Sequence, residues 1–258
     1  MKIISLGAGV QSSTMFLLSC MGKLPRADVA IFADTGSEPA EVYEYLDYLR
    51  GLSGTYGIPI ETVTQGSLEN DILELSADKR IASIPFFIKS GTDSGGMSRR
   101  QCTAEYKLRP IKKRVRELLT ERNEKKADVS IGISLDETQR MKPSKVNYME
   151  NHWPLIDMRW SRLDCLNWYE RQGLRTPPRS ACVFCPFHND HEWKRIKDND
   201  PDAWSRTLAV DNAIRKHPRF NHEVYLHREM KPIDEIQFGE DPSQISLFGN
   251  ECEGYCGI

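Results

Sequence analysis

Two features are missing from this sequence: a long hydrophobic run and a marked excess of charge of one sign. No apolar stretch approaches the roughly 20 residues that a membrane-spanning helix needs. The formal net charge is -2 with 28% charged residues, which excludes a bulk polyanion binder of the histone kind. Internal repeats and low-complexity segments are missing as well. We therefore expect a soluble, cytoplasmic protein without membrane contact, long enough at 258 residues for one α/β core and a smaller lobe.

The N-terminal turn also lacks the G-x-x-x-x-G-K-[ST] pattern of a Walker-type P-loop. Residues 7–14 nevertheless lie between an apolar strand predicted at 2–5 and an apolar run at 15–18 that continues as a helix. Glycines let the backbone approach an anion, while N–H groups and the helix dipole attract it. The turn is therefore a candidate nucleotide site, with the candidate ligands Gly7, Gly9, Gln11, Ser12, Ser13 and Thr14.

Two other interpretations of the turn stay open. Gly7-x-Gly9-x-x-Ser12 is close to the dinucleotide fingerprint G-x-G-x-x-G, and Asp34 follows at about the distance of a ribose-binding acid. Serine replaces the third glycine, however, and three consecutive hydroxyls suit phosphate oxygens better than close helix packing. The remaining alternative is a glycine turn that only starts a helix.

Strands and helices are predicted to alternate through the first part of the chain, which indicates a parallel sheet. The predicted strands are 2–5, 29–33, 58–63 and 129–133, and the predicted helices include 38–50, 67–75 and 108–123. Ligands bind beyond the carboxyl ends of such strands. The glycine turn, Asp34 and Ser134 all follow strands, so we expect one shared site there.

The pattern of apolar residues changes at about residue 160, and no further apolar strand is predicted after it. We therefore expect a nucleotide-binding domain at 1–160. A helical, cysteine-bearing C-terminal lobe with a mobile tail is expected at 161–258.

Three strand-following segments resemble the PP-loop ATP pyrophosphatases, in particular their 3′-phosphoadenylyl-sulfate (PAPS) reductase branch. Residues 7–13 lie on the S-G-G-x-D-S-[ST] turn of that family, with Gly7, Ala8 and Gln11 at the positions that differ. Asp34-Thr35-Gly36 matches a D-T-G that lies near the adenosine in the family. The resemblance implies a twisted, mainly parallel α/β sheet of the HUP/adenine nucleotide α-hydrolase-like type.

Residues 132–140 are the third segment and are similar to the G-x-[RS]-x-x-E-x-x-R stretch of the same branch. Acids and an arginine at this place suit magnesium and phosphate, so Ser134, Asp136, Glu137 and Arg140 are candidate site residues. A helix cap with an i,i+3 ion pair would explain the last two without any function.

Seven cysteines in a reducing compartment indicate metal binding or redox chemistry more than disulfides. Cys182 and Cys185 form a C-x-x-C before Pro186, and Cys102 lies ahead of a K-x-x-P that begins at Lys107. In the resembling branch, cysteines at these places hold a [4Fe–4S] cluster beside the nucleotide. The resemblance implies that these three cysteines are ligands and that Lys107 contacts the nucleotide.

Zinc bound by the C-x-x-C with His188 and His191 is the alternative metal site, although its C-x2-C-x2-H-x2-H spacing is unusually tight. A redox dithiol and two structural thiols stay open too. Cys20 and Cys165 lie on apolar helix faces and are expected in the core.

The C-terminal tail contains Cys252 and Cys256, and parts of it match the E-C-G-[IL]-H tail of PAPS reductases. The resemblance makes these cysteines candidate catalytic thiols, sulfur carriers or a fourth cluster ligand. A tail without a role is the alternative.

The resemblance predicts an ATP-dependent enzyme that adenylates an acceptor and transfers sulfur to it. ATP, Mg²⁺ and a [4Fe–4S] cluster would be bound, and DNA phosphorothioation and tRNA thiolation proteins share this layout. The acceptor would be a DNA, a tRNA or a nucleoside, and a cysteine desulfurase or another donor would supply sulfur. Basic residues crowd around Cys102, which suits a phosphate-rich ligand. The alternatives are a PAPS or APS reductase and a zinc-bound, non-enzymatic nucleic-acid module.

Overall fold

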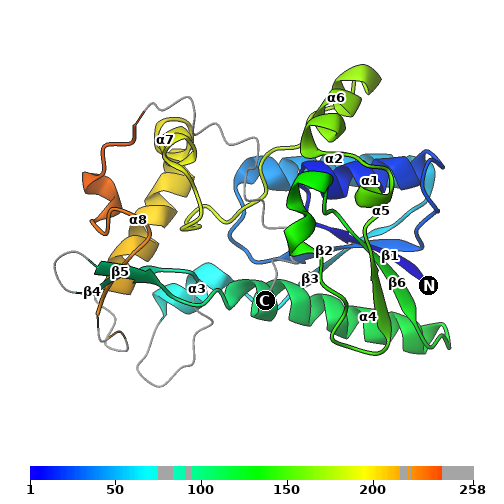
Figure 1. Ribbon diagram of the computed structural model, residues 1–258, viewed down its shortest axis with the longest axis horizontal. Helices are drawn as coiled ribbons and strands as arrows, with labels where there is room; N and C mark the ends of the chain where they lie inside the picture. Colours follow the sequence, from blue (N-terminus) through cyan, green and yellow to red (C-terminus); the bar gives the residue numbers. More distant parts are fainter. Residues whose placement is uncertain (75–83, 91–93, 216–219, 221, 240–258) are drawn as a thin grey trace.

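The protein is an α/β structure built on a parallel sheet, as the alternation of elements predicts. The computed structural model describes residues 1–74, 84–90, 94–215, 220 and 222–239 (Figure 1). Its main sheet has five strands in the order β3-β2-β1-β6-β7, and all of its pairings are parallel. The strands are β1 (Lys2–Leu6), β2 (Val29–Asp34), β3 (Ile60–Thr64), β6 (Ala127–Ile131) and β7 (Met149–His152).

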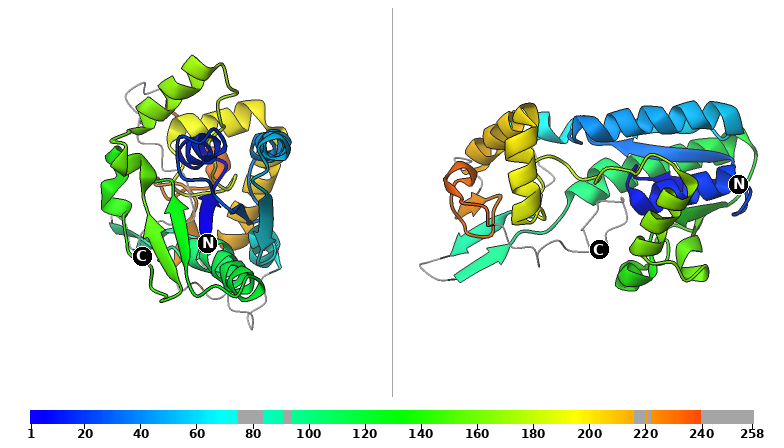
Figure 2. Two further views of the ribbon diagram at one scale, coloured as in Figure 1. Left: turned by 90° about the vertical axis from the view of Figure 1, so that its right-hand side faces the viewer. Right: turned by 90° about the horizontal axis from the view of Figure 1, so that it is seen from above.

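Helices cover both faces of this sheet (Figure 2). They are α1 (Val10–Cys20), α2 (Ala40–Tyr56), α4 (Arg109–Glu121), α5 (Pro154–Asp157) and α6 (Arg162–Gln172). Successive residues of a strand point to opposite faces. Ile4 accordingly packs in the core under α1, α2 and α6, whereas Ile3 packs in the core under α4.

A second hydrophobic core lies beside the first. It is formed by α3 (Leu68–Leu73), β4 (Phe87–Ser90), β5 (Ser94–Met97), α7 (Asp190–Asn199), α8 (Pro201–Arg215) and β8 (Glu223–Tyr225). The three strands pair antiparallel in the order β5-β4-β8. The sequence analysis did not predict this small sheet, nor β7 of the main sheet.

The two cores do not divide the chain at a single point. The helix α6 packs on α1 in the first core, whereas α3 packs on α8 and joins the second core together with Ile84 and Phe86. The expected boundary between residues 160 and 161 stays a prediction, but contacts cross it in both directions.

A short π-helical segment connects the second core to α4. This segment, η1 (Thr103–Leu108), follows Cys102 and runs directly into α4. π-Helical turns occur frequently at functional sites. Two further short segments are the 3₁₀ turns η2 (Leu135–Arg140) and η3 (Ile233–Glu235).

Within the part of the chain that the structure describes, no helix combines the length and the apolar character needed to cross a membrane.

Candidate nucleotide and cysteine site

The glycine turn joins β1 to α1 in a strained but tightly held conformation. Ala8 has a positive φ of 58° and is fully buried. The Gly7 N–H donates to Ser12 Oγ at 3.0 Å, which ties the end of the strand to the first turn of the helix. Gly9 is the N-cap and makes no side-chain cap, so the positive end of the helix dipole lies at the turn. This geometry is suited to an anion.

The hydroxyls of the turn differ in their hydrogen bonding. Thr14 Oγ1 donates to the Val10 carbonyl at 2.6 Å, so this hydroxyl is used inside the helix. Ser13 Oγ is buried and makes no hydrogen bond of normal geometry within the described residues, although burial raises the pKa of Tyr45 and the Ser13 hydroxyl partly offsets that rise. A buried hydroxyl without a partner is costly unless a ligand or water completes it.

Gln11 links the glycine turn to the segment after β6. Its Nε2 donates to Glu137 Oε2 at 3.2 Å and to Ser134 Oγ at 3.4 Å, while its Oε1 accepts from Arg162 at 3.0 Å. Glu137 also pairs with Arg140. Three sequence-predicted residues are thereby brought to the turn, and Arg162 is a neighbour that the sequence analysis missed.

Asp136 has a different local role. Its carboxylate accepts from the Arg162 backbone N–H at 3.0 Å, at the first residue of α6. Aspartate at a helix N-terminus is a favourable partner for exposed N–H groups. Asp136 therefore anchors α6 beside the segment that carries Glu137.

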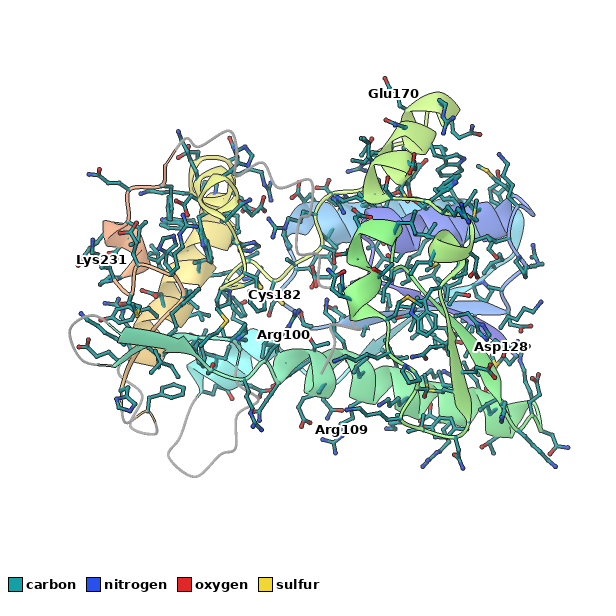
Figure 3. The ribbon with its side chains drawn as sticks, in the orientation of Figure 1. Arg100, Arg109, Asp128, Glu170, Cys182 and Lys231 are labelled. Carbon is teal, nitrogen blue, oxygen red and sulfur yellow. The ribbon has the colours of Figure 1, made fainter. Side chains whose placement is uncertain are left out.

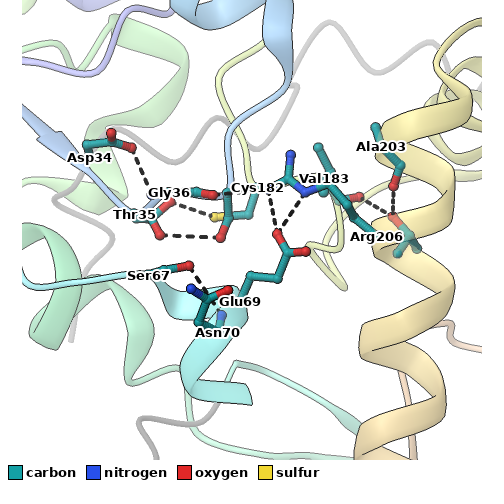
Figure 4. A network of polar contacts seen from close by, with 12 residues as sticks. Asp34, Thr35, Gly36, Ser67, Glu69, Asn70, Cys182, Val183, Ala203 and Arg206 are labelled. Carbon is teal, nitrogen blue, oxygen red and sulfur yellow. Dashed lines mark hydrogen bonds and ion pairs between the residues drawn. The ribbon is translucent and has the colours of Figure 1, made fainter. Parts of the chain in front are cut away.

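The D-T-G segment after β2 contacts the cysteine loop (Figure 4). Asp34 accepts from the Gly36 N–H and from Tyr43 Oη, both at 2.8 Å, which fixes the turn. Thr35 Oγ1 lies 3.4 Å from Cys182 Sγ. Between the same two segments, the Val183 N–H donates to the Ser37 carbonyl at 2.9 Å. The end of β2 and the C-x-x-C are thus in direct contact.

Cys102, Cys182 and Cys185 come from two distant segments and pack in the same hydrophobic cluster. Cys182 lies between the two groups of elements that form the two cores (Figure 3). The C-x-x-C forms a tight turn, in which the Cys185 N–H donates to the Cys182 carbonyl at 2.9 Å. Cys182 and Cys185 thus share one turn, and Cys102 packs against the same hydrophobic cluster, while their role as ligands stays a prediction.

His188 supports the turn through one ring nitrogen, and its other ring nitrogen, Nδ1, is buried without a hydrogen-bond partner among the described residues. Its Nε2 lies 2.9 Å from the Cys182 carbonyl, and complete burial lowers the pKa of the imidazole to about 3. The ring is therefore neutral, and with Nε2–H donating to the carbonyl it holds the cysteine turn in shape.

The three thiols of Cys102, Cys182 and Cys185 are not grouped closely enough to share one metal ion. Among the described residues, three His, Cys, Asp or Glu ligand atoms come within 4.8 Å of one another at Asp128, Glu150 and His152, far from this site. The sulfurs of the three cysteines are more widely spaced. One zinc ion needs its sulfurs at about 2.3 Å from a common centre. A polynuclear iron–sulfur cluster binds each thiolate at its own iron and does not need the sulfurs to converge on one point, so a cluster at these cysteines stays a prediction.

A buried ion pair lies beneath the cysteine loop. Lys107 Nζ is 3.0 Å from Glu38 Oε1, and Ser180 Oγ donates to Glu38 Oε2 at 3.2 Å. Glu38 is fully buried and Lys107 is only 4% exposed. Lys107 was expected to contact a nucleotide, and the structure places it against this carboxylate. The sequence analysis missed Glu38 as a site residue. Its place two residues after Asp34-Thr35-Gly36, at the end of a predicted strand, could have indicated it.

Most predicted site residues gather at the carboxyl ends of β1, β2 and β6. This group comprises Gly7, Gly9, Gln11, Ser12, Ser13, Thr14, Asp34, Thr35, Gly36, Lys107, Ser134, Asp136, Glu137, Arg140 and Cys182. Cys102 and Cys185 join it through the shared cluster. Cys252 and Cys256 lie outside the described residues. Their roles, like the ligand roles of the others, stay predictions.

The comparisons with known proteins assign no family to this chain. No protein-family model and no curated protein matches the chain. Among solved structures it is similar to the U34-tRNA thiolase NcsA from Methanococcus maripaludis with its [4Fe-4S] cluster, at 13% identity and a TM-score of 0.43. The similarity covers 82% of this chain and 70% of that one. At this identity and TM-score the function must be argued from the residues of the chain itself.

Proposed function

We propose that the chain is an ATP-dependent sulfur-transfer enzyme acting on a nucleic acid or nucleoside. The observation that carries the proposal is the contact between Thr35 Oγ1 and Cys182 Sγ at 3.4 Å. It joins the strand-end segment beside the glycine turn to a loop of thiols. A nucleotide site and a sulfur site in contact are what adenylation followed by sulfur transfer requires.

ATP would be held by the turn at residues 7–14 and by the D-T-G segment at 34–36. Backbone N–H groups and the α1 dipole would face the phosphates, and the Ser12, Ser13 and Thr14 hydroxyls are proposed to lie in the same turn. Mg²⁺ would neutralise the phosphates beside Glu137, and Arg140 would stabilise charge that develops at phosphorus.

The reaction balances without a change of oxidation state when sulfur enters as sulfide. An acceptor oxygen attacks the α-phosphorus, the bond from that phosphorus to the β-bridging oxygen breaks, and pyrophosphate leaves. Sulfide then donates an electron pair to the acceptor atom that bears the adenylated oxygen, the bond between that atom and the oxygen breaks, and AMP leaves with the oxygen.

Cys102, Cys182 and Cys185 would hold the sulfur-bearing group as thiolate ligands. An iron–sulfur cluster bound there would supply a site at which sulfide is held next to the nucleotide. Cys252 and Cys256 are proposed as a fourth ligand or as sulfur-carrying thiols. His188 and the Lys107–Glu38 pair keep the cysteine loop in place from beneath.

The test is anaerobic reconstitution with ferrous iron and sulfide, followed by incubation with ATP, sulfide and unmodified tRNA or DNA. We expect bound iron, and sulfur-containing nucleotides detected by mass spectrometry, in the wild-type protein and in Cys20→Ser. The Cys20 thiol is a suitable control because burial raises its pKa to about 11 and keeps it unreactive. Cys182→Ser should lose both signals.

Two results would reject the proposal. Sulfite released from PAPS without ATP would identify a sulfonucleotide reductase. Zinc in place of iron, together with no ATP binding, would identify a non-enzymatic metal-bound module.

A further inference from the structure

A groove lined by basic side chains runs along α4, away from the cysteine loop. Its volume is about 640 Å³. It is lined by Lys112, Lys113, Arg116, Glu117, Thr120, Glu121 and Tyr148. We call it the α4 groove.

The basic residues lie along one stripe of the helix. Arg109, Lys112, Lys113 and Arg116 are spaced i, i+3, i+4 and i+7, which places them on one face. The opposite face is apolar and is buried against the main sheet. The stripe is therefore held outward by the same packing that fixes the helix.

The two acidic residues of the α4 groove share one arginine. Arg114 lies 2.7 Å from Glu61, 3.4 Å from Glu117 and 2.8 Å from Glu121. The lining itself carries three cations, Lys112, Lys113 and Arg116, against the two carboxylates of Glu117 and Glu121, so it keeps an excess of positive charge.

Lys145 adds a further positive charge that acts on Lys112. Partial burial and the charge of Lys145 lower the pKa of Lys112. Over the described ranges no carboxylate forms an ion pair with Lys112, Lys113, Arg116 or Lys145. Cations brought together without a counter-charge are unfavourable alone and become favourable when an anion binds.

Tyr148 orders this surface from the other side of the α4 groove. The Arg116 guanidinium carbon lies 4.8 Å from the centre of the Tyr148 ring, and Tyr148 Oη donates to the Lys112 carbonyl at 3.4 Å. An arginine stacked on an aromatic ring loses less freedom when it binds a phosphate. The α4 groove is thus partly organised before any ligand arrives.

We infer that the α4 groove binds the phosphodiester backbone of the nucleic-acid acceptor, an inference that rests on the proposed function. The helix begins at Arg109, two residues after Lys107, whose ammonium group lies at the site. Its 13 residues span about 20 Å. A polynucleotide laid along the stripe therefore runs towards the nucleotide turn, whereas a mononucleotide acceptor would have no use for it.

The test compares two triple variants in salt titrations of binding to bulk tRNA and to mixed-sequence duplex DNA. The groove triple combines Lys112→Gln and Lys113→Gln in the lining with Lys145→Gln, whose charge acts on Lys112. The control triple is Lys23→Gln, Lys89→Gln and Lys231→Gln, which removes the same charge from exposed positions outside the α4 groove. The groove triple should lower the slope of log K against log salt by about 2 to 3, because each phosphate contact contributes about 0.9. The control triple should keep the wild-type slope.

ATP binding, measured separately, distinguishes this inference from the proposed function. Both triples should bind ATP as the wild type does and unfold at the same temperature. If the wild type binds neither nucleic acid, or if the groove triple binds like the control, the inference fails even where ATP binding and sulfur transfer persist. Loss of nucleic-acid binding in the groove triple alone supports it even in a protein that proves unable to turn over ATP.

Discussion

At the scale of single residues, the buried Lys107–Glu38 pair is the most consequential contact. Removing one partner of a buried ion pair leaves an uncompensated charge, which costs about 3–5 kcal/mol. We predict that Lys107→Met lowers the free energy of unfolding by this amount in urea denaturation. The double variant Lys107→Met/Glu38→Gln should recover much of it, since no charge is then left buried.

An exposed pair provides the control for this prediction. Asp47 and Arg50 lie 2.7 Å apart on α2 with both side chains exposed, so Asp47→Asn should cost less than about 1 kcal/mol. Equal losses in Lys107→Met and Asp47→Asn would show that the buried pair is not important for stability.

Ala8 gives a second prediction at this scale. A non-glycine residue in the left-handed region costs about 1–2 kcal/mol, and glycine avoids that cost while losing some chain entropy. Ala8→Gly should therefore raise the free energy of unfolding by up to about 1 kcal/mol, measured in urea, and Ala8→Val should lower it. A destabilised Ala8→Gly protein would mean that the methyl group packs too well to be removed.

The sequence located residues of the site when they followed a predicted strand. Thr35, Ser134 and the glycine turn were found in this way, because strand ends in a parallel sheet meet at one edge. The Lys107–Glu38 pair was not predicted, because the partners are 69 positions apart and nothing local signals which buried charge meets which. The link from Gln11 to Glu137, 126 positions away, was missed for the same reason.

At the scale of elements, α6 is a helix whose existence was predictable and whose partner was not. Its apolar spacing predicts a buried face, but periodicity does not say against which helix that face packs. In the structure Cys165, Trp168 and Tyr169 pack into the core with α1. The antiparallel sheet was missed because β5, Ser94–Met97, contains two glycines and has little strand propensity of its own.

The capping box of α6 predicts a pH dependence. Ser161 and Asp164 exchange hydrogen bonds at the first turn, and the bonds from Ser161 lower the pKa of Asp164. The folded pKa lies below the unfolded value, so this stabilisation is present above the usual aspartate pKa and is lost as the pH falls through the folded value.

Thermal unfolding of Asp164→Asn against the wild type checks this prediction. The wild type should be more stable by about 0.5–1 kcal/mol at neutral pH, which is the range for a helix cap. The difference should shrink as the pH falls into the acid range. A difference that stays constant with pH would contradict the role of the carboxylate.

At the scale of the whole molecule, Arg206 of α8 connects the two cores at the site. It lies 2.8 Å from Glu69 of α3 and donates to the Gly36 carbonyl at 3.0 Å (Figure 4). Arg206→Met should lower the free energy of unfolding by about 1.5–3 kcal/mol, the range for hydrogen bonds to charged groups. A double-mutant cycle with Glu69→Gln should give a coupling of about 0.5–3 kcal/mol. Strict additivity would contradict a direct link.

The layout of the whole molecule was predictable only in part. The parallel sheet and the site at its carboxyl edge followed from the alternation of strands and helices. The interleaving of the two cores was not predictable, because hydrophobic patterning reports how much of an element is buried and not which neighbour buries it.

The measurement that tests the account most directly is the position at which ATP is cleaved. ATP labelled at the α-phosphate should be incubated with the reconstituted protein, sulfide and a nucleic-acid acceptor, and the products separated. The account predicts AMP and pyrophosphate in equal amounts. ADP and phosphate, or no turnover by a protein that holds iron, would contradict it.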